Sequence, residues 1–309
     1  MRTHTRWQYT IHIALLSVIV IFLLFGRAQA GAPGETSLIP SSPPPPLGIG
    51  ESTSRLYLPL VLDRPVQADG VGLGGPHKMA VNPQLWGRFR WIYNWITVGQ
   101  GFGDWPGYRP MIWGDGLEWY GGAAGIRWFA TRWPGRQWLF LNEPERASQA
   151  NLPPEYAAQV VTSHRDLVTG ADPTATWGCC GVQVDATGMA WLDRYIDAGG
   201  PVGDFWHIHI YGVEDCNPAS SLQALHNFEA WAEARGITRP ILITEFGCLF
   251  GGPPQRACDY IANIVPALRA DPLVTGWAWW SSGDGTYPLF DDQGNPTEVG
   301  QCYLNTGQR

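Results

Sequence analysis

The sequence of 309 residues is poor in charged side chains. They make up 15 % of the chain, whereas an average soluble domain has roughly 25 %. Lysine occurs once, at Lys78, and no run of basic residues is present. Proteins bind nucleic acid through clustered Lys and Arg side chains. The scarcity of lysine and the net charge of −7 therefore argue against a nucleic-acid-binding protein.

The sequence also lacks the ligand spacings of a structural metal site. It contains no C-x-x-C motif, and the adjacent pair Cys179–Cys180 is poorly placed to chelate a tetrahedral ion. The remaining cysteines are Cys216, Cys248, Cys258 and Cys302. An even number of cysteines permits disulfides in a secreted chain, although the sequence does not choose among the pairings. A Cys248–Cys258 bond is consistent with the short loop between these two residues.

Only one long apolar run is present, at residues 11–25. Arg2 and Arg6 precede it, and small residues at Ala28 and Ala30 follow it, which is the pattern of a secretory signal peptide. The run is shorter than the ~20 residues that a membrane-spanning helix needs. We therefore expect residues 1–30 to be a signal peptide and the protein to be secreted. The alternative is an uncleaved anchor, which would associate the protein with the cell surface.

Proline, glycine and tryptophan are abundant, with 26, 38 and 17 residues respectively. Six of the prolines lie within residues 31–46, and such a segment favours an extended linker. We expect residues 31–65 to form this linker together with a short apolar segment, and residues 66–309 to form the catalytic domain. A tryptophan-rich chain with little charge suits a neutral ligand with flat apolar faces, such as carbohydrate.

From residue 70 onward, short apolar runs alternate with helical patterns. The runs cover residues 70–74, 89–95, 108–114, 137–142, 174–182, 204–211, 240–246 and 274–281. The clearest helical patterns cover residues 155–167, 189–198, 220–235 and 256–268, whereas glycine and tryptophan obscure the pattern at 116–135. Eight strands alternating with helices over ~240 residues predict the α/β class and a single (β/α)8 TIM barrel.

Catalytic residues of such barrels lie where the strands end. Two apolar runs end in carboxylates, at Glu143 and Glu245. A pair of facing carboxyl groups is what cleavage of a glycosidic bond requires, because one donates a proton while the other attacks the anomeric carbon or activates water. The other strand ends supply side chains suited to sugar rings and hydroxyls: Asn94, Trp95, Trp113, Asn142, His207, His209, Tyr211, Trp279 and Trp280.

Other interpretations exist for each of these residues. Glu143 alone could be a helix-start carboxylate, and Glu245 alone could be a salt-bridge partner. The H-x-H pair His207 and His209 could bind a metal ion, but a barrel metal site normally takes further ligands from other strands. We therefore expect no metal and no cofactor, and a sugar-contacting or nucleophile-orienting role for the two histidines.

The ordered set of motifs resembles glycoside hydrolase family 128, the glycosyl hydrolase catalytic-core family, in clan A of the retaining glycosidases. Fungal alkali-sensitive-linkage proteins and endo-β-1,3-glucanases belong to it. The matching segments are WIYNW (91–95), PMIWG (110–114), FLNEP (140–144), WLD (191–193), DFWHIHIYG (204–212), LITEF (242–246), GWAW (276–279), DQG (292–294), TEVG (297–300) and Tyr303. The resemblance covers roughly residues 70–305.

The resemblance implies a role for several of the candidates. Glu143 would be the acid/base and Glu245 the nucleophile, and Asn142 would hold the 2-hydroxyl of the substrate. His209 and Tyr211 would line the site near the nucleophile. Three tryptophans would be sugar platforms: Trp95, Trp113 and Trp280.

Two positions depart from the family pattern. Glu145 stands where aspartate is more usual, and Cys179–Cys180 stands where the family tends to have a Ser-Pro-Ala-like strand end. These departures bear on the local subsite and on glucan preference.

We therefore expect a secreted, monomeric, retaining endo-β-1,3-glucanase that binds a polysaccharide or oligosaccharide substrate. One alternative is another clan A specificity, for a β-1,4-glycan or a galactan. The other is a non-catalytic carbohydrate-binding protein of the cell surface. The presence of both glutamates argues against the binding protein, because binding alone does not need the pair.

Overall fold

The computed structural model describes residues 70–75, 82–97, 102–212, 216–281, 283 and 285–307. All of these residues belong to one compact unit, residues 62–309. The expected signal peptide and linker, the start of the expected domain at residue 66, and Lys78 lie outside the described residues. None of the described helices has the length and apolar composition of a membrane span.

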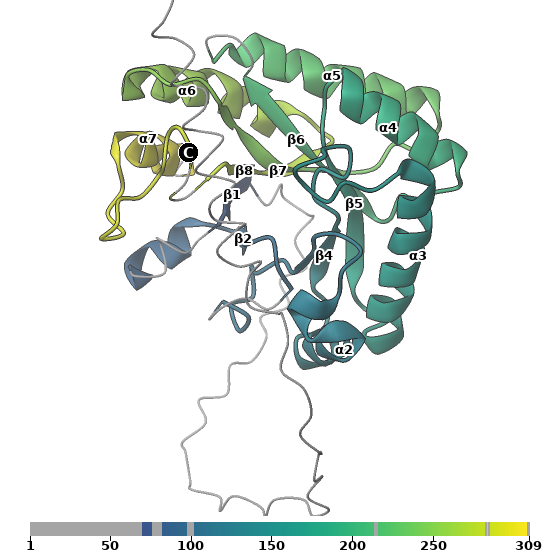
Figure 1. Ribbon diagram of the computed structural model, residues 1–309. Coiled ribbons are helices and arrows are strands. Elements are labelled where there is room, and N and C mark those ends of the chain that lie inside the picture. Colours follow the sequence, from purple (N-terminus) through teal and green to yellow (C-terminus); the bar gives the residue numbers. More distant parts are fainter. Residues whose placement is uncertain are drawn as a thin grey trace, which may run out of the picture. The chain divides into compact units, whose positions relative to one another are not determined.

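Eight parallel strands form the centre of this unit (Figure 1). They are β1 (Gly70–Gly74), β2 (Trp91–Tyr93), β3 (Met111–Ile112), β4 (Gln137–Phe140), β5 (Thr176–Gln183), β6 (Phe205–Gly212), β7 (Ile241–Cys248) and β8 (Val274–Trp279). Their order in the sheet is β2-β1-β8-β7-β6-β5-β4-β3. A parallel bridge between Ile92 and Tyr108 joins β2 to the chain entering β3 and closes the barrel. The prediction of a (β/α)8 barrel is confirmed, and each expected run overlaps one strand, with β5, β6 and β7 extending one or two residues beyond theirs.

Helices follow strands β3 to β8 and surround the barrel (Figure 1). They are α2 (Gly122–Arg132), α3 (Pro154–Ala171), α4 (Ala186–Asp197), α5 (Pro218–Ala234), α6 (Pro254–Ala270) and α7 (Glu298–Thr306), with short 3-10 turns η2 (Pro83–Arg88) and η3 (Glu118–Tyr120). Proline occupies the first turn of α3, α5 and α6, where its missing N–H costs nothing. The unclear stretch at 116–135 contains η3 and α2. Left-handed Gly121 separates them, and α2 begins at Gly122, which also has a positive φ angle.

Two apolar clusters hold the barrel together. The larger fills the space between strands and helices. The smaller takes side chains from six strands and therefore fills the barrel interior: Trp91, Tyr93, Met111, Leu139, Phe205, Leu242 and Ala278. Trp91 is the largest of them, and the guanidinium of Arg109 lies 4.3 Å from its ring centre. Trp95 and Trp113 pack on this cluster and are only partly buried.

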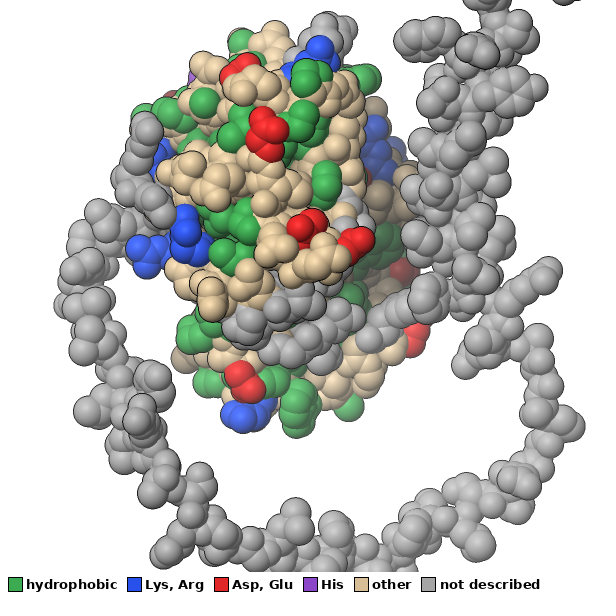
Figure 2. Space-filling view, turned by 90° about the vertical axis from the view of Figure 1, so that its left-hand side faces the viewer, with side chains coloured by type: hydrophobic (Ala, Val, Ile, Leu, Met, Phe, Trp, Pro, Cys, Tyr) green, Lys and Arg blue, Asp and Glu red, His purple; other side chains and the backbone are tan. Residues whose placement is uncertain are grey.

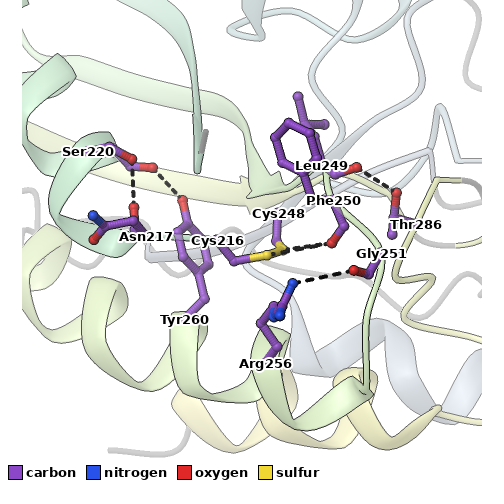
Figure 3. The surroundings of a disulfide bond; sticks show 11 residues. Cys216, Asn217, Ser220, Cys248, Leu249, Phe250, Gly251, Arg256, Tyr260 and Thr286 are labelled. Carbon is purple, nitrogen blue, oxygen red and sulfur yellow. Dashed lines mark hydrogen bonds between the residues drawn. A yellow bond between two sulfur atoms is a disulfide. The ribbon is translucent and has the colours of Figure 1, made fainter. Parts of the chain in front are cut away.

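Three disulfides form, and the expected Cys248–Cys258 bond is not among them. Cys248 ends β7 and pairs with Cys216 from the segment after β6 (Figure 3). Cys258 lies in α6 and pairs with Cys302 of α7. The prediction relied on the short distance in sequence between Cys248 and Cys258. Cys258 instead lies on the face of α6 that packs against α7, and there it meets Cys302. The third bond links the neighbours Cys179 and Cys180 within β5.

Charged side chains are sparse on the surface. On the face shown in Figure 2, acidic and basic side chains are scattered among apolar and uncharged ones. No continuous basic patch covers the described part of that face, in keeping with the composition.

Candidate active site

Glu143 lies in the turn that follows β4, and its backbone is held in an unusual conformation. Leu141 and Glu143 have φ angles of 69° and 42°, in the left-handed region that most side chains avoid. The N–H of Glu143 donates to the carbonyl of Gly181 in β5 at 2.9 Å. Trp95, another predicted site residue, also has a positive φ, of 60°. Such strained residues concentrate at functional sites, where the surrounding structure fixes them.

Gly181 makes this arrangement possible. It has a φ of 64°, and a Cβ atom there would lie 2.8 Å from the ring of His207 and 2.9 Å from the carbonyl oxygen of Leu141. The pairing of β5 with β6 shifts register between Cys180 and Val182. This bulge turns the Gly181 carbonyl toward Glu143, so the end of β5 positions the carboxylate that follows β4.

Glu245 lies within β7 and is 4 % exposed. Its carboxylate accepts three hydrogen bonds. The indole N–H of Trp95 donates to Oε1 at 2.9 Å, and the hydroxyl of Tyr211 donates to Oε2. The third donor is the hydroxyl of Tyr93, 3.2 Å from Oε1, whose single hydrogen is shared with the closer carbonyl of Thr244 at 2.9 Å. Hydrogen bonds of this kind stabilise a carboxylate in its ionised form.

His209 lies between the two glutamates. Its Nδ1 is 3.0 Å from Oε1 of Glu143 and 3.6 Å from Oε2 of Glu245. One carboxylate oxygen of each glutamate and a ring nitrogen of His209 all lie within 4.8 Å of one another. Retaining glycosidases place their two carboxyl groups ~5–5.5 Å apart, whereas inverting enzymes leave ~6.5–9.5 Å for a water molecule. The distance between one oxygen of Glu143 and one oxygen of Glu245, at most 4.8 Å, lies on the shorter side of these two ranges.

The charges of these groups depend on one another. Burial raises the pKa of Glu245, with His209 acting to lower it, Glu143 to raise it, and the hydrogen bonds from Tyr211 and Trp95 to lower it. Burial disfavours the protonated form of His209, but the negative charges of Glu245 and Glu143 outweigh burial and raise its pKa. A protonated His209 in turn offsets the charge of the buried carboxylates.

Asn142 and Asn94 also reach this end of the barrel. Asn142 is 3 % exposed, and its side-chain N–H donates to Oε1 of Gln149 at 3.3 Å. Its Oδ1 has no hydrogen-bond partner among the described residues, so it can accept a hydrogen bond from a ligand hydroxyl. Asn94 is half-buried, and its Oδ1 accepts a 2.6 Å hydrogen bond from Tyr108.

The tryptophans divide into two groups. Trp95, Trp113 and Trp280 are half-buried, and Trp280 meets the edge of the Tyr211 ring at a centroid distance of 6.3 Å. Trp279 is fully buried, and its N–H donates to the carbonyl of Tyr287 at 3.0 Å. This corrects the prediction that Trp279 contacts substrate, because strand alternation turns it outward into the core under the helices.

His207 is a second correction. It is fully buried, with Nε2 2.9 Å from the carbonyl of Phe140 and Nδ1 3.3 Å from the hydroxyl of Thr244. Burial lowers its pKa to about 3, so it stays neutral. With both nitrogens occupied by protein groups, His207 supports the floor of the site and has no contact to offer a ligand.

Two residues outside the predicted set belong to the site. Tyr93 donates to Glu245, and its position two residues before Trp95 in the expected apolar run could have identified it, since alternate residues of a strand share a face. Glu145 has a side chain only 1 % exposed, and its Oε1 accepts a 2.9 Å hydrogen bond from the N–H of Gln183. Only its place beside Asn-Glu-Pro drew attention to it in the sequence.

The cluster of Glu143, His209 and Glu245 resembles a metal centre in spacing only. The N–H and O–H groups of Trp95 and Tyr211 point at the oxygens of Glu245, where a cation would have to bind. Donors of this kind suit an anion or an uncharged substrate. The expectation that no metal takes part stays a prediction.

The chain matches one family model, described as the glycosyl hydrolase catalytic core, over residues 70–303. It is similar to the structure of a family 128 subgroup II endo-β-1,3-glucanase from Sorangium cellulosum, with 27 % identity and a TM-score of 0.60 over 77 % of this chain and 98 % of that one. No curated protein sequence matches it.

Two further solved structures are similar. One is a subgroup III curdlan-specific exo-β-1,3-glucanase from Blastomyces gilchristii, solved with glucose, with 25 % identity, a TM-score of 0.61 and coverage of 78 % and 99 %. The other is a subgroup I endo-β-1,3-glucanase from Amycolatopsis mediterranei, solved with laminaritriose, with 23 % identity, a TM-score of 0.57 and the same coverage. At this identity, the similarity to the Amycolatopsis enzyme shows a shared fold.

The two adjacent tryptophans at the end of β8 should respond differently to truncation. Trp279 contacts the rings of Phe246, Tyr260 and Tyr303 at centroid distances of 5.3, 6.2 and 6.3 Å. Trp279→Ala should therefore lower the free energy of unfolding by about 3–5 kcal/mol, the cost of a large core cavity. The half-buried Trp280→Ala is the matched control and should lose about 1 kcal/mol or less. Urea unfolding measures both, and equal losses would show that the two residues are buried alike.

Proposed function

The chain belongs to the glycosyl hydrolase catalytic-core family and is a glycoside hydrolase, and from this premise we propose that it cleaves β-1,3-glucan by double displacement. The observation that carries the mechanism is the spacing of Glu143, His209 and Glu245 within 4.8 Å. The substrate class is supported by the solved β-1,3-glucanases at 25 and 27 % identity, which align over nearly their whole length.

Glu245 is the nucleophile in this proposal. It is the more buried carboxylate, and the hydrogen bonds that it accepts favour its ionised form against burial and aim it at one place. Its oxygen attacks the anomeric carbon, and the bond from that carbon to the leaving oxygen breaks. The product of this step is a glycosyl ester on Glu245 with inverted configuration at the anomeric carbon.

Glu143 is the acid and then the base. It is the more exposed of the pair, at 13 % against 5 % for the side chains, and so it reaches the leaving group and water more easily. In the first step its proton passes to the leaving oxygen. In the second step it takes a proton from water, whose oxygen attacks the anomeric carbon, releases Glu245 and restores the original configuration.

His209 and Asn142 assist this pair in the proposed mechanism. The His209 ring orients Glu143 by its 3.0 Å hydrogen bond and balances the charge of Glu245. The unpartnered Oδ1 of Asn142 is available to the 2-hydroxyl of the sugar at the cleavage site. We propose Trp95, Trp113 and Trp280 as flat surfaces for the apolar faces of sugar rings, and Asn94 and Tyr211 as further contacts.

The mode of cleavage and the setting of the enzyme are finer proposals. We propose endo cleavage, as in the relative of highest identity described above, although the similar structures include both endo and exo enzymes. The leader pattern at residues 1–30 supports secretion, and an uncleaved leader would retain the enzyme at the cell surface. We propose a monomer.

A polysaccharide panel separates the candidate substrates. Laminarin and curdlan should release soluble oligosaccharides, and endo cleavage should give mixed lengths from the start. Soluble β-1,4-glucan and β-1,4-galactan are the alternatives within the clan. Hydrolysis of either at a rate equal to or above that on laminarin would overturn the β-1,3 assignment, and binding of laminarin without any product would support the non-catalytic alternative.

Replacing each glutamate should produce a different stereochemical result with azide. Glu245→Ala should lower kcat/KM by at least about four orders of magnitude. The vacated space keeps the donors Trp95, Tyr93 and Tyr211, so azide should enter it and form an α-glycosyl azide from an activated β-glycoside. Glu143→Ala is the matched variant and should give a β-glycosyl azide instead. Nuclear magnetic resonance identifies the anomers, and the reversed pattern would exchange the two roles.

A further inference from the structure

Two adjacent apolar side chains are exposed in the loop that follows β7. Leu249 is 38 % exposed and Phe250 is 51 % exposed, directly after Cys248 at the end of the strand. Trp128 of α2 and Tyr156 of α3 are the other large apolar side chains exposed in the described part of the chain, and each stands on its own helix. Single exposed apolar residues are ordinary on a surface, whereas a pair beside an active-site rim is a candidate for ligand contact.

The backbone beneath this pair is held at three successive carbonyl groups (Figure 3). The hydroxyl of Thr286 donates to the carbonyl of Leu249 at 3.0 Å. The two sulfurs of the Cys216–Cys248 disulfide lie 3.7 and 3.5 Å from the carbonyl oxygen of Phe250, and Arg256 donates to the carbonyl that follows at 3.4 Å. The two side chains are therefore presented by a fixed backbone, so a ligand that binds them does not have to order the loop first.

Figure 3 shows where this backbone directs the two side chains. Leu249 and Phe250 point away from the disulfide and from Tyr260 and Arg256, both residues of α6. Because α6 lies on the outside of the barrel, the pair lies on the side of the loop that faces the barrel mouth (Figure 1). The loop follows the strand that carries Glu245, so the pair belongs to the same rim as the proposed nucleophile.

The pair also continues the surface that begins at Trp280. The N–H of Trp280 donates to the carbonyl of Phe246 in β7 at 3.0 Å, which places this residue beside the end of that strand. Gly285 packs on the indole, since a Cβ atom there would lie 2.6 Å from the ring. Its neighbour Thr286 makes the hydrogen bond to Leu249 described above. The Trp280 platform and the exposed pair are therefore joined through two consecutive residues, and a ligand bound on one can continue onto the other.

The chemistry of the loop suits an uncharged ligand. Residues 249–254 read LFGGPP and include no charged or hydrogen-bonding side chain. Such a surface offers apolar contact only, which a sugar ring meets with its C–H face and which a charged polymer does not use. Two half-exposed side chains are also far smaller than the ~800 Å² per partner of a stable protein interface, so a second copy of the chain is not favoured.

We propose that Leu249 and Phe250 form an outer subsite for a sugar unit of the glucan chain, beyond Trp280 and away from the bond that is cleaved. This inference rests on the proposed function, because it takes the substrate to be a β-1,3-glucan chain. Burial of the Phe250 ring against the sugar stabilises the complex between the enzyme and a long chain. A substrate too short to reach the loop gains nothing from it.

Truncation of the pair should therefore have an effect that depends on the length of the substrate. In the double variant that combines Leu249→Ala with Phe250→Ala, the KM for laminarin should rise about 5- to 10-fold, the scale of one lost apolar contact, with kcat unchanged. The KM for an aryl β-glucoside with a single sugar should not rise. Phe250→Tyr keeps the flat ring and should keep the KM for laminarin near the wild-type value. The melting temperature should stay unchanged in both variants, because the two side chains are exposed.

Trp128→Ala is the matched control. It removes an aromatic side chain that is 57 % exposed on α2, and its KM for laminarin should equal that of the wild type. An unchanged KM in the double variant, or an equal rise for laminarin and for the aryl glucoside, would overturn the proposal. A wild-type dimer in light scattering that the double variant converts to a monomer would also overturn it, because the pair would then contact a second copy of the chain.

Binding to insoluble curdlan separates this inference from the proposed function. Wild-type protein should sediment with curdlan at low temperature, and the double variant should bind it with an apparent Kd higher by the same factor as the KM. If the pair contributes to curdlan binding but the wild type releases no product from laminarin, the proposed function fails and the subsite stands. If the wild type hydrolyses laminarin and both proteins bind curdlan equally, the subsite fails and the proposed function stands.

Discussion

The burial of one carboxylate, Glu245, in a nearly water-free position is the constraint on which the architecture around it depends. Burial alone favours the neutral form of this group and would make it a poor nucleophile. The protein opposes burial with three hydrogen-bond donors and one imidazole. Trp95 and Tyr93 come from the end of β2, and Tyr211 and His209 from β6. Each donor lies within the first few residues that precede or follow a strand end, so the closed barrel is what brings them to one carboxylate.

Irregularities in the strands aim these groups. The pairing of β6 with β7 shifts register between Ile208 and His209, and that of β7 with β8 shifts between Ile243 and Phe246, on either side of Glu245. The bulge at Gly181 and the left-handed Glu143 do the same for the second carboxylate. In regular strands these side chains would alternate strictly between the two faces of the sheet and would not point at one another. Bulges near active sites re-aim side chains in this way, and the buried core of the barrel absorbs the local strain.

The sequence was sufficient for the architecture because parallel strands buried on both faces appear as continuous apolar runs, and proline and glycine mark the helix limits. It also predicted that Glu143 and Glu245 lie close together, as they do in the structure, because strand ends meet at one rim. The sequence did not show how far below the rim of the barrel each residue of a strand lies. His207 and His209 share a face, yet one lies about 6.6 Å lower, a two-residue rise, and contacts only protein. Disulfide pairing failed for a similar reason, since the direction of α6 decides which cysteine Cys258 meets.

The central claim is that Glu245 is an ionised nucleophile that forms a covalent bond to the substrate. A 2-deoxy-2-fluoro β-glucosyl or β-1,3-glucobiosyl donor with a good leaving group slows both steps but traps the intermediate. Intact-mass and peptide mass spectrometry of the treated enzyme should show one added glycosyl group, located on the peptide that contains Glu245, and the label should turn over when an acceptor sugar is added. A label on Glu143, or hydrolysis of the donor with inversion and no adduct, would contradict this account.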